Sequence, residues 1–361
     1  MSRLNNDALR RIIASEPVIL GDGSTGVLVE RVLIPQMFRG RILSEIKEAA
    51  ESYRNRDPYW SFMLNMFPEG EEAVRESHRQ YLDATSDHFW TVLLMNTFRG
   101  NEEILTKGLL QGRLEELNRK AAHNLEHVLR VSGRRNVLTV ASIGPSGDCY
   151  NPTDCASQEE ARALHYAQLH ALHPFVDYFL FETFPSAEEM RGALDALRDV
   201  NMSYADRGNG ARMAGVSFVL IPDAGDPTRM GKILDGSHPG AVMERIKDEY
   251  CDVVLYGGFN CSPPEAVLAG LRRVGDYDPS LLPFIRDVHI NPSETDPAHR
   301  AQIQGVQTLP SEEFVRFYEQ LDALFPHVIF KWGCCGIFPE HIRALHDYYH
   351  VKFPDHKPLQ P

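Results

Sequence analysis

Apolar, β-branched runs alternate with amphipathic stretches along most of the chain. Near-continuous apolar runs of this kind are typical of parallel strands that are buried on both faces. The pattern predicts eight strands, at Val18–Gly23, Thr91–Phe98, Asn136–Pro145, Tyr178–Phe184, Arg212–Leu220, Asp252–Cys261, Leu281–Asn291 and His327–Gly336.

Helical patterns fill the intervals between these runs. One begins after the fourth predicted strand, with Ser186 as its expected N-cap and Glu189 at capping-box spacing. Another follows the sixth strand, with Ser262 as the expected cap and Pro263 in the first helical turn. Eight strands that alternate with helices predict an α/β fold, a single (β/α)8 TIM barrel that spans residues 1–361 as one domain. A doubly wound open sheet is the alternative, and the count of eight favours the barrel.

Two segments exceed a minimal barrel. The stretch from Pro35 to Pro58 is rich in Arg and Glu and predicts an inserted helical segment after the first strand. A long polar loop from Asn291 to Pro310 follows the seventh strand. Long loops on a compact domain are often functional lids.

Composition and charge narrow the class of protein. The 43% of apolar residues can fill a large core, and the 24% of charged residues are ordinary for a globular protein. The net charge of -13 argues against nucleic acid as a partner, because such binders usually present a basic face. No apolar run reaches the roughly 18 residues of a membrane-spanning helix, and the N-terminus lacks the pattern of a signal peptide. We therefore expect a cytoplasmic protein without a membrane partner, and its oligomeric state is left open.

Three of the six cysteines stand in two glycine-flanked motifs at predicted strand ends. In a reducing compartment a disulfide framework is not expected, and such clusters more often bind metal or catalyse. Cys261 from the sixth strand would meet Cys334 and Cys335 from the eighth at one barrel mouth. Zinc accepts thiolates readily, and three protein ligands leave its fourth position open for water or substrate. The alternative is a small buried Cys261 beside an accidental cysteine pair, and the flanking glycines favour zinc.

Other polar residues also stand where predicted strands end, and the active site of such a barrel lies on that face. They are Asp22, Asn96, Thr97, Ser142, Glu182, Asn260 and Asn291. A carboxylate at Glu182, directly after an apolar run, would be costly if buried without a purpose. Asp22 could instead cap a turn, and Asn260 could orient the loop of Cys261 rather than touch a substrate.

These motifs resemble the homocysteine S-methyltransferase family, which includes betaine-dependent and S-methylmethionine-dependent enzymes. The matching stretches follow the family's order over nearly the whole chain: GDGSTGVLVE, PYWSFMLNMFPE, MNTFRGN, ASIGP, FLFETFPSAEEM, GGFNCSPPEAV and KWGCCG. GGFNC and GCCG are the specific part. The resemblance implies a (β/α)8 barrel with a catalytic zinc ion held by Cys261, Cys334 and Cys335.

The resemblance also implies the substrates and their contacts. Asp22 and Glu182 would hold the amino group of homocysteine, while the backbone at Gly23 together with Thr97 would hold its carboxylate. Asn260 is assigned to the same substrate site. The implied reaction is transfer of a methyl group from an onium-type donor to the homocysteine thiol, which gives methionine.

The chain departs from the family's pattern around the donor. Ser24 replaces a glycine of the opening motif, and Asn291–Thr295 replaces a motif close to Pro-Asn-Ser-Gly-Glu. Arg99 and Thr183 stand where betaine enzymes have tyrosines, so a betaine site built on aromatic–cation contacts is not expected. The expected donor is S-methylmethionine or S-adenosylmethionine. The alternatives are a non-catalytic zinc-binding barrel, a different acceptor thiol, or a donor carried by a corrinoid partner protein.

Overall fold

The computed structural model describes residues 3–33, 60–107, 110–206, 210–223, 225–292 and 307–360. The helical insertion expected between Pro35 and Pro58 lies outside the described residues. So do residues 293–306, which include most of the polar loop after the seventh strand.

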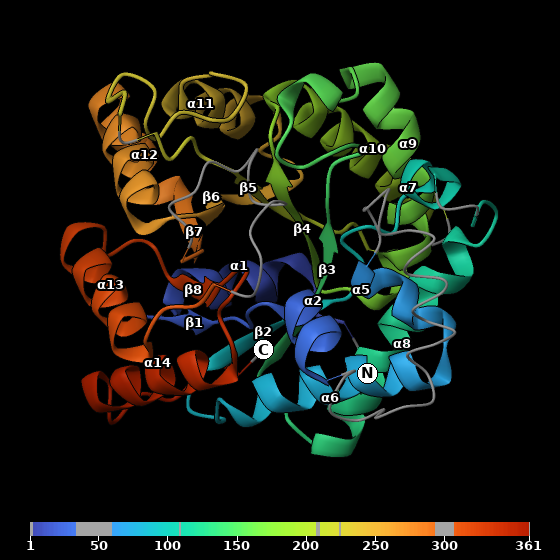
Figure 1. Cartoon of the computed structure of the whole chain (residues 1–361), viewed down its shortest axis with the longest axis horizontal. Helices are drawn as coiled ribbons and strands as arrows, with labels where there is room; N and C mark the ends of the chain where they lie inside the picture. Colours follow the sequence, from blue (N-terminus) through green and yellow to red (C-terminus); the bar gives the residue numbers. More distant parts are fainter. Residues whose placement is uncertain are drawn as a thin grey trace.

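Eight parallel strands form a closed barrel in which strands follow one another in chain order and β8 pairs with β1 (Figure 1). They are β1 Ile19–Leu20, β2 Trp90–Met95, β3 Val137–Ile143, β4 Tyr178–Phe184, β5 Ala214–Phe218, β6 Val254–Ser262, β7 Ile285–Ile290 and β8 Phe330–Gly333. The predicted TIM barrel is confirmed. The open-sheet alternative is wrong, because the β1–β8 pairing leaves no edge strand.

Helices surround the barrel and connect its strands (Figure 1). The α-helices are α1 Asn6–Ser15, α2 Thr25–Val27, α5 Trp60–Met63, α6 Pro68–Asp83, α7 Glu102–Lys107, α8 Leu114–Ser132, α9 Gln158–Leu172, α10 Ala187–Ala205, α11 Pro239–Glu249, α12 Pro264–Tyr277, α13 Ser311–Leu324 and α14 Pro339–Lys352. A π-helix, Leu28–Leu33, extends α2. Short 3₁₀ helices span Leu64–Met66, Pro152–Asp154, His173–Phe175 and Pro279–Phe284.

Side chains alternate between two cores along the strands, as the strand period of two requires. On β2, Val92 packs in the cluster inside the barrel, whereas Leu93 packs in the cluster between the barrel and its helices. Helix α1 contributes Leu9 and Ile12 to the inner cluster. The backbone N–H of Leu4 also bonds the carboxylate of Asp177, directly before β4, so α1 closes the N-terminal end of the barrel.

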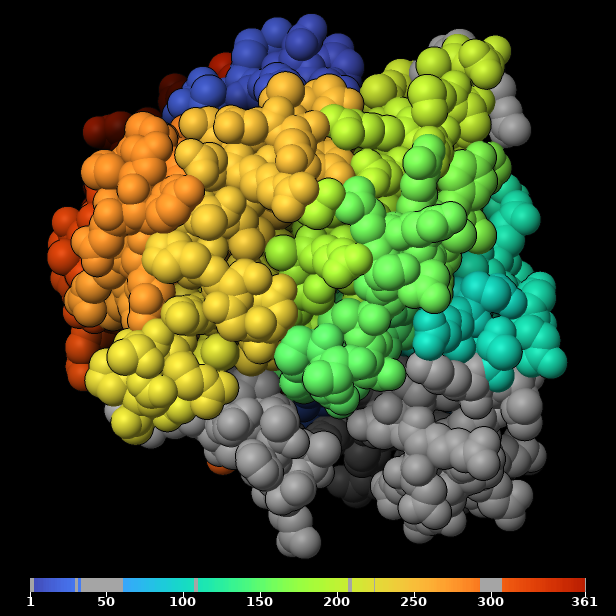
Figure 2. All heavy atoms as spheres, turned by 90° about the horizontal axis from the view of Figure 1, so that it is seen from above, coloured from blue at the N-terminus to red at the C-terminus, as the bar shows by residue number. Residues whose placement is uncertain are grey.

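The opposite end of the barrel is therefore the end that carries the loops after the strands. Figure 2 shows α1 in blue at one end of the molecule, while the loops after β3 in green and after β5 in yellow lie toward the other end. No helix in the described part of the chain is long and apolar enough to cross a membrane.

Two of the predicted helix starts need correction. Ser186 caps α10 as expected, but the carboxylate of Glu189 accepts from the backbone N–H of Ser146 at 2.6 Å instead of completing a capping box. Ser262 is the last residue of β6 and not a cap, because its hydroxyl accepts from the N–H of Leu220 at 2.9 Å. In both cases a partner from another strand-end loop replaces the local one.

Candidate metal centre and substrate site

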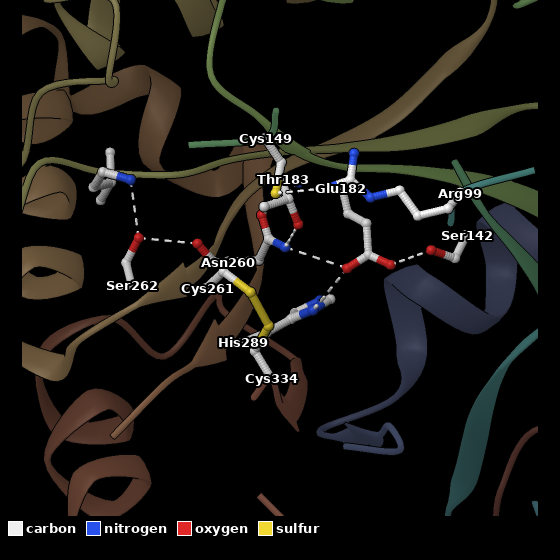
Figure 3. Close-up of a disulfide and its surroundings, with 11 residues drawn as sticks. Arg99, Ser142, Cys149, Glu182, Thr183, Asn260, Cys261, Ser262, His289 and Cys334 are labelled. Atoms are coloured by element: carbon white, nitrogen blue, oxygen red, sulfur yellow. Dashed lines mark hydrogen bonds and ion pairs between the residues drawn. A yellow bond between two sulfur atoms is a disulfide. The ribbon is translucent and has the colours of Figure 1, made fainter. Parts of the chain in front are cut away.

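The barrel mouth brings together the polar residues that follow the strands. Closure of the sheet places the C-terminal end of every strand on one face, so residues far apart in sequence become neighbours. Ser142 on β3, Glu182 on β4 and Asn260 on β6 form one hydrogen-bonded group there (Figure 3). The predicted convergence of these three residues is therefore present.

The three cysteines predicted as metal ligands also meet. The sulfur atoms of Cys261, Cys334 and Cys335 all lie within 4.8 Å of one another, and no other group of potential ligands among the described residues comes so close. Cys261 is the penultimate residue of β6, and the other two follow β8 directly. Sulfurs around a tetrahedral zinc ion lie roughly 3.8 Å apart, given Zn–S bonds of about 2.3 Å. The three cysteines therefore offer the kind and number of donor atoms that a zinc site with an open fourth position uses.

The oxidation state of the cluster differs from the expectation. Cys261 and Cys334 are joined by a disulfide (Figure 3), and Cys335 is not part of it. No disulfide framework was expected, and the one disulfide among the described residues joins two of the predicted metal ligands. Barrel closure brings their Cα atoms to 5.4 Å, within the usual reach of a disulfide, although 73 residues separate them in sequence. Zinc binding by all three sulfurs requires that this bond be reduced.

Asn260 ties the cysteine loop to the loop that carries Glu182. Its side-chain oxygen accepts from the N–H of Thr183 at 2.9 Å, and its amide donates to the hydroxyl of Thr183 at 2.7 Å. The same amide lies 3.2 Å from Oε2 of Glu182. Asn260 is fully buried, and its hydrogen bonds to Thr183 and Glu182 fit the orienting role considered from the sequence.

Glu182 is held on several sides at the mouth. Ser142 donates its hydroxyl to Oε1, Asn260 donates to Oε2, and Nδ1 of His289 lies 4.0 Å from Oε2. Burial raises the pKa of the Glu182 carboxyl, and the charge of His289 and the hydrogen bond from Ser142 oppose that rise. The site is therefore built to keep a buried carboxylate oriented.

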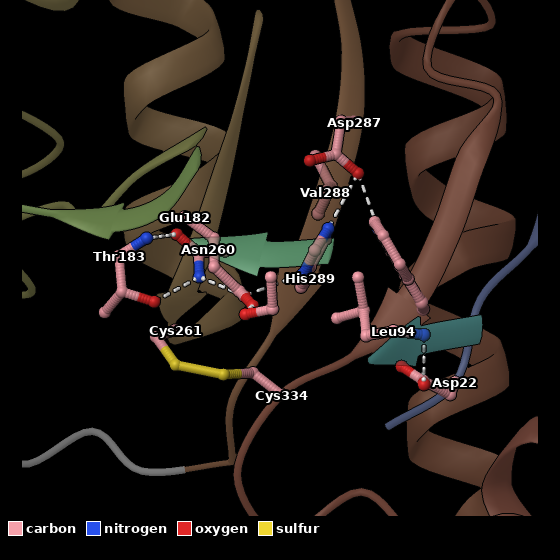
Figure 4. A network of polar contacts seen from close by, with 12 residues as sticks. Asp22, Leu94, Glu182, Thr183, Asn260, Cys261, Asp287, Val288, His289 and Cys334 are labelled. Carbon is pink, nitrogen blue, oxygen red and sulfur yellow. Dashed lines mark hydrogen bonds and ion pairs between the residues drawn. A yellow bond between two sulfur atoms is a disulfide. The ribbon is translucent and has the colours of Figure 1, made fainter. Parts of the chain in front are cut away.

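Asp22 presents a second buried carboxylate. Its Oδ2 accepts from the N–H of Leu94 at 2.9 Å, while Oδ1 is buried without a hydrogen-bond partner among the described residues (Figure 4). Burial raises the pKa of the Asp22 carboxyl well above its usual range, and the nearby charge of Glu182 raises it further. A cationic group that paired with both carboxylates would offset this cost.

Gly23 and Thr97 are both placed at the mouth, but they differ in what they can offer. A side chain at Gly23 would lie 2.3 Å from the carbonyl oxygen of Ile337, so only glycine fits there. Thr97 donates its hydroxyl to the carbonyl of Ser142 at 2.7 Å and its N–H to the carbonyl of Met95 at 2.8 Å. Both donors of Thr97 are thus engaged within the protein.

Arg99 and Thr183, which stand where betaine enzymes have tyrosines, are both near the mouth (Figure 3). Arg99 donates to the carbonyl of Gly147 at 2.7 Å and to the sulfur of Cys149 at 3.3 Å. These contacts connect the loop after β2 with the loop after β3. Neither residue presents an aromatic face to a cation.

Two residues beneath the site were not expected from the sequence. Asp287 and His289 on β7 are buried inside the barrel, and Oδ1 of Asp287 lies 2.8 Å from Nε2 of His289 (Figure 4). Their signal is present in the sequence, because two polar residues at positions i and i+2 of an apolar strand must share a face. Both residues lie within the predicted seventh strand and not at its end, where the candidate site residues were sought.

Comparison with known proteins identifies the family of the chain. The family model described as homocysteine S-methyltransferase matches residues 20–349. No curated protein sequence matches the chain. Among solved structures, the homocysteine methyltransferase MmuM from Escherichia coli is similar in its metallated form, with a TM-score of 0.64, 20% identity and coverage of 94% of this chain and 99% of that one. Its oxidized form has a TM-score of 0.62 at 18% identity, with coverage of 95% and 100%.

The family match spans the barrel from β1 to the last helix and includes all three cysteines. The solved structures support the same barrel fold over nearly the whole chain. The chain therefore belongs to the homocysteine S-methyltransferase family and is an enzyme of the methyltransferase class.

Proposed function

We propose that the protein transfers a methyl group from an onium-type donor, S-methylmethionine or S-adenosylmethionine rather than betaine, to the thiol of homocysteine, giving methionine. The observation that carries this proposal is the meeting of three cysteine sulfurs within 4.8 Å of one another, close to two buried carboxylates (Figure 4). The proposal treats residues 1–361 as one domain. A reducing compartment such as the cytoplasm suits it, because the site needs three free thiols.

In this proposal Cys261, Cys334 and Cys335 hold a zinc ion after the disulfide is reduced. The chemistry that the ion supplies when bound is activation of the acceptor thiol, which has a pKa of about 8.5 and is mostly protonated at neutral pH. No residue of the described chain then has to act as a base beside that thiol. The remaining work of the protein is to place the acceptor and the donor in line.

Asp22 and Glu182 bind the amino group of the acceptor. Both carboxylates are buried, which is costly without a positively charged partner. An ammonium group between them supplies that partner. The free Oδ1 of Asp22 is a ready acceptor for one of its hydrogens. For the carboxylate of homocysteine we retain the backbone around Gly23, because Thr97 already donates both of its hydrogens within the protein.

The donor assignment rests on what surrounds the mouth. Arg99 and Thr183 offer no aromatic box for a quaternary ammonium group, which is the contact that favours betaine. A sulfonium donor does not need an aromatic box. It requires space in line with the acceptor sulfur and a site for its amino-acid end.

The test combines metal analysis with activity. The reduced protein is expected to hold about one zinc ion per chain, and Cys261→Ala is expected to lose it. Cys251→Ala is the matched control, because Cys251 is an exposed free cysteine outside the cluster. Methionine formation is then measured with S-methylmethionine, S-adenosylmethionine, betaine and methylfolate in parallel.

Each result has a defined meaning. Methionine formed from a sulfonium donor, with loss in Cys261→Ala and retention in Cys251→Ala, supports the proposal. Zinc content that does not change in Cys261→Ala overturns the ligand assignment. Zinc binding without methionine from any of the four donors would identify a non-catalytic zinc-binding barrel instead.

A further inference from the structure

The interior of the barrel below the cysteine cluster holds a hydrogen-bonded pair of ionisable side chains that an ordinary apolar core would not contain. Asp287 and His289 lie two residues apart on β7, and both are at most 1% exposed. Oδ1 of Asp287 accepts from Nε2 of His289 at 2.8 Å and also from the indole N–H of Trp332 (Figure 4). The indole N–H can only donate, so Trp332 fixes the Asp287 carboxyl from one side and His289 contacts it from another.

The surrounding strands make room for this pair. Gly258 on β6 lies opposite Asp287, and a side chain there would come within 2.6 Å of the Cβ of Asp287. A side chain at Gly21 would come within 2.0 Å of the ring of Trp332. The two glycines therefore permit a buried carboxylate and its indole donor at the centre of the barrel.

His289 is held so that its other nitrogen faces the substrate site. Its ring packs against Trp332 with the ring centroids 3.8 Å apart, which limits its rotation. Nδ1 then lies 4.0 Å from Oε2 of Glu182. The carboxyl group of Asp287, the imidazole of His289 and the carboxyl group of Glu182 thus lie in a row from the centre of the barrel to the mouth.

Ionisable side chains are costly to bury. Apolar residues of similar size at the same positions usually give a protein that is equally stable or more stable. The upper end of this row is Glu182, the carboxylate that the proposed function assigns to the acceptor's amino group. Burial raises the pKa of Glu182, and among its neighbours the charge of His289 most strongly opposes that rise. The neutral donors Ser142 and Asn260 orient Glu182 but bring no charge.

We propose that Asp287 and His289 are positioning residues for recognition of the acceptor's amino group: Asp287 fixes the imidazole, and the imidazole fixes the carboxylate of Glu182. This inference rests on the proposed function, because it assigns Glu182 to homocysteine. Neither residue touches the reacting atoms. Their removal should therefore weaken binding of the amino group and leave the methyl-transfer step itself in place.

The experiment compares two acceptors that differ only in the amino group, homocysteine and 4-sulfanylbutanoate. In His289→Leu and in Asp287→Asn, the KM for homocysteine is expected to rise about tenfold while kcat stays within about twofold. The KM for 4-sulfanylbutanoate should not change. A general loss of structure would raise the KM for both acceptors, so it could not produce this difference. Tyr256→Phe is the matched control, since the Tyr256 hydroxyl is buried inside the same barrel and bonds Tyr178 rather than the site.

Two further measurements separate the possible failures. Homocysteine turnover by the unmodified protein tests the proposed function before any variant is considered. A crystal structure of each variant is independent of turnover, and the Glu182 carboxylate is expected to leave its place between Ser142 and Asn260. If Glu182 stays in place, or if both acceptors weaken equally in the variants, the inference is overturned. Asp287→Asn preserves shape, so it remains informative if His289→Leu does not fold.

Discussion

Two residues other than glycine adopt left-handed backbone conformations at the barrel mouth, Thr183 with φ of 60° and Cys261 with φ of 48°. Such conformations cost roughly 1–2 kcal/mol each in a residue with a side chain. Asn260 connects the two residues: it directly precedes Cys261 in the chain, and its side-chain oxygen accepts a hydrogen bond from the N–H of Thr183. Strained backbone of this kind persists where surrounding contacts over-determine it, often at functional sites. Here it aims Glu182 and Cys261 at the same space.

A second residue-scale feature concerns stability rather than the site. His78 on α6 is fully buried, and neither ring nitrogen has a hydrogen-bond partner among the described residues. Burial lowers the pKa of His78 to about 4, whereas the unfolded chain retains the usual value of about 6.5. Between these values the unfolded state binds a proton that the folded state does not. Stability therefore falls as the pH drops through this window.

We expect His78→Leu to remove this part of the pH dependence. From pH 7.5 to pH 5, the free energy of unfolding of the unmodified protein should fall by about 2 kcal/mol more than that of the variant. Urea unfolding at the two pH values measures the difference, and the values at pH 7.5 account for any change in packing. Equal pH dependence in the two proteins would contradict the assignment.

At the scale of elements, the helices are held by close packing onto one another as well as onto the barrel. Gly192 on α10 is buried against α9, where a side chain would lie 2.3 Å from the carbonyl oxygen of Gln158 and 2.6 Å from the Cβ of Ala161. Glycine is a poor helix former, so its presence in the middle of α10 has a packing reason. The close packing of α9 against α10 thus requires a residue without a side chain at position 192.

Gly192→Ala sets helix propensity against this packing. Alanine would stabilise an exposed helix by about 1 kcal/mol, but overpacking of a buried contact costs typically about 1–3 kcal/mol. We expect net destabilisation of about 1 kcal/mol, measured by urea unfolding. Met202→Ala on the same helix is the control, because Met202 is 61% exposed and its replacement should change stability by less than about 0.5 kcal/mol. If Gly192→Ala were more stable than the unmodified protein, the two helices would be able to shift apart at little cost and accommodate the added methyl group, which would contradict this account.

At the scale of the whole molecule, closure of the barrel brings two of the candidate metal ligands close enough to form a disulfide. The disulfide joins the ends of β6 and β8 and passes over β7 between them. The two sulfurs of this bond cannot also serve as thiolate ligands, because the thiolate is the metal-binding form. The disulfide and a three-thiolate site therefore exclude one another in the same molecule. Reduction of the disulfide to two thiolates takes two electrons from an added reductant, and each thiolate that becomes a thiol takes one proton from solvent.

Counting thiols tests this alternative. After oxidation and unfolding, alkylation without a reductant should label the four cysteines outside the disulfide, and alkylation after reduction should label all six. Zinc uptake should require the reduced form. In Cys251→Ala both label counts should fall by one, which checks the method. Six labels before reduction, or zinc bound stoichiometrically by the oxidised protein, would exclude the Cys261–Cys334 pairing.

Much of this architecture could be predicted from the sequence, because it depends on residues that are close along the chain. Apolar runs and helical periods identified all eight strands, and β4 has the bounds that the pattern predicted. Other boundaries shifted: only Ile19 and Leu20 of the first predicted strand form β1, since the chain then turns toward α2. Polar residues at strand ends identified the mouth, and the glycine-flanked cysteines identified the candidate metal ligands.

Contacts between strands distant in sequence were decided only by the tertiary structure. The Cys261–Cys334 bond, the engagement of Thr97 by Ser142 and the chain from Asp287 to Glu182 all depend on the register of the closed barrel. No local period encodes that register, because it is fixed by pairing along the whole sheet. The sequence by itself thus determined which chemical groups reach the mouth, and the folded barrel determined which of them meet.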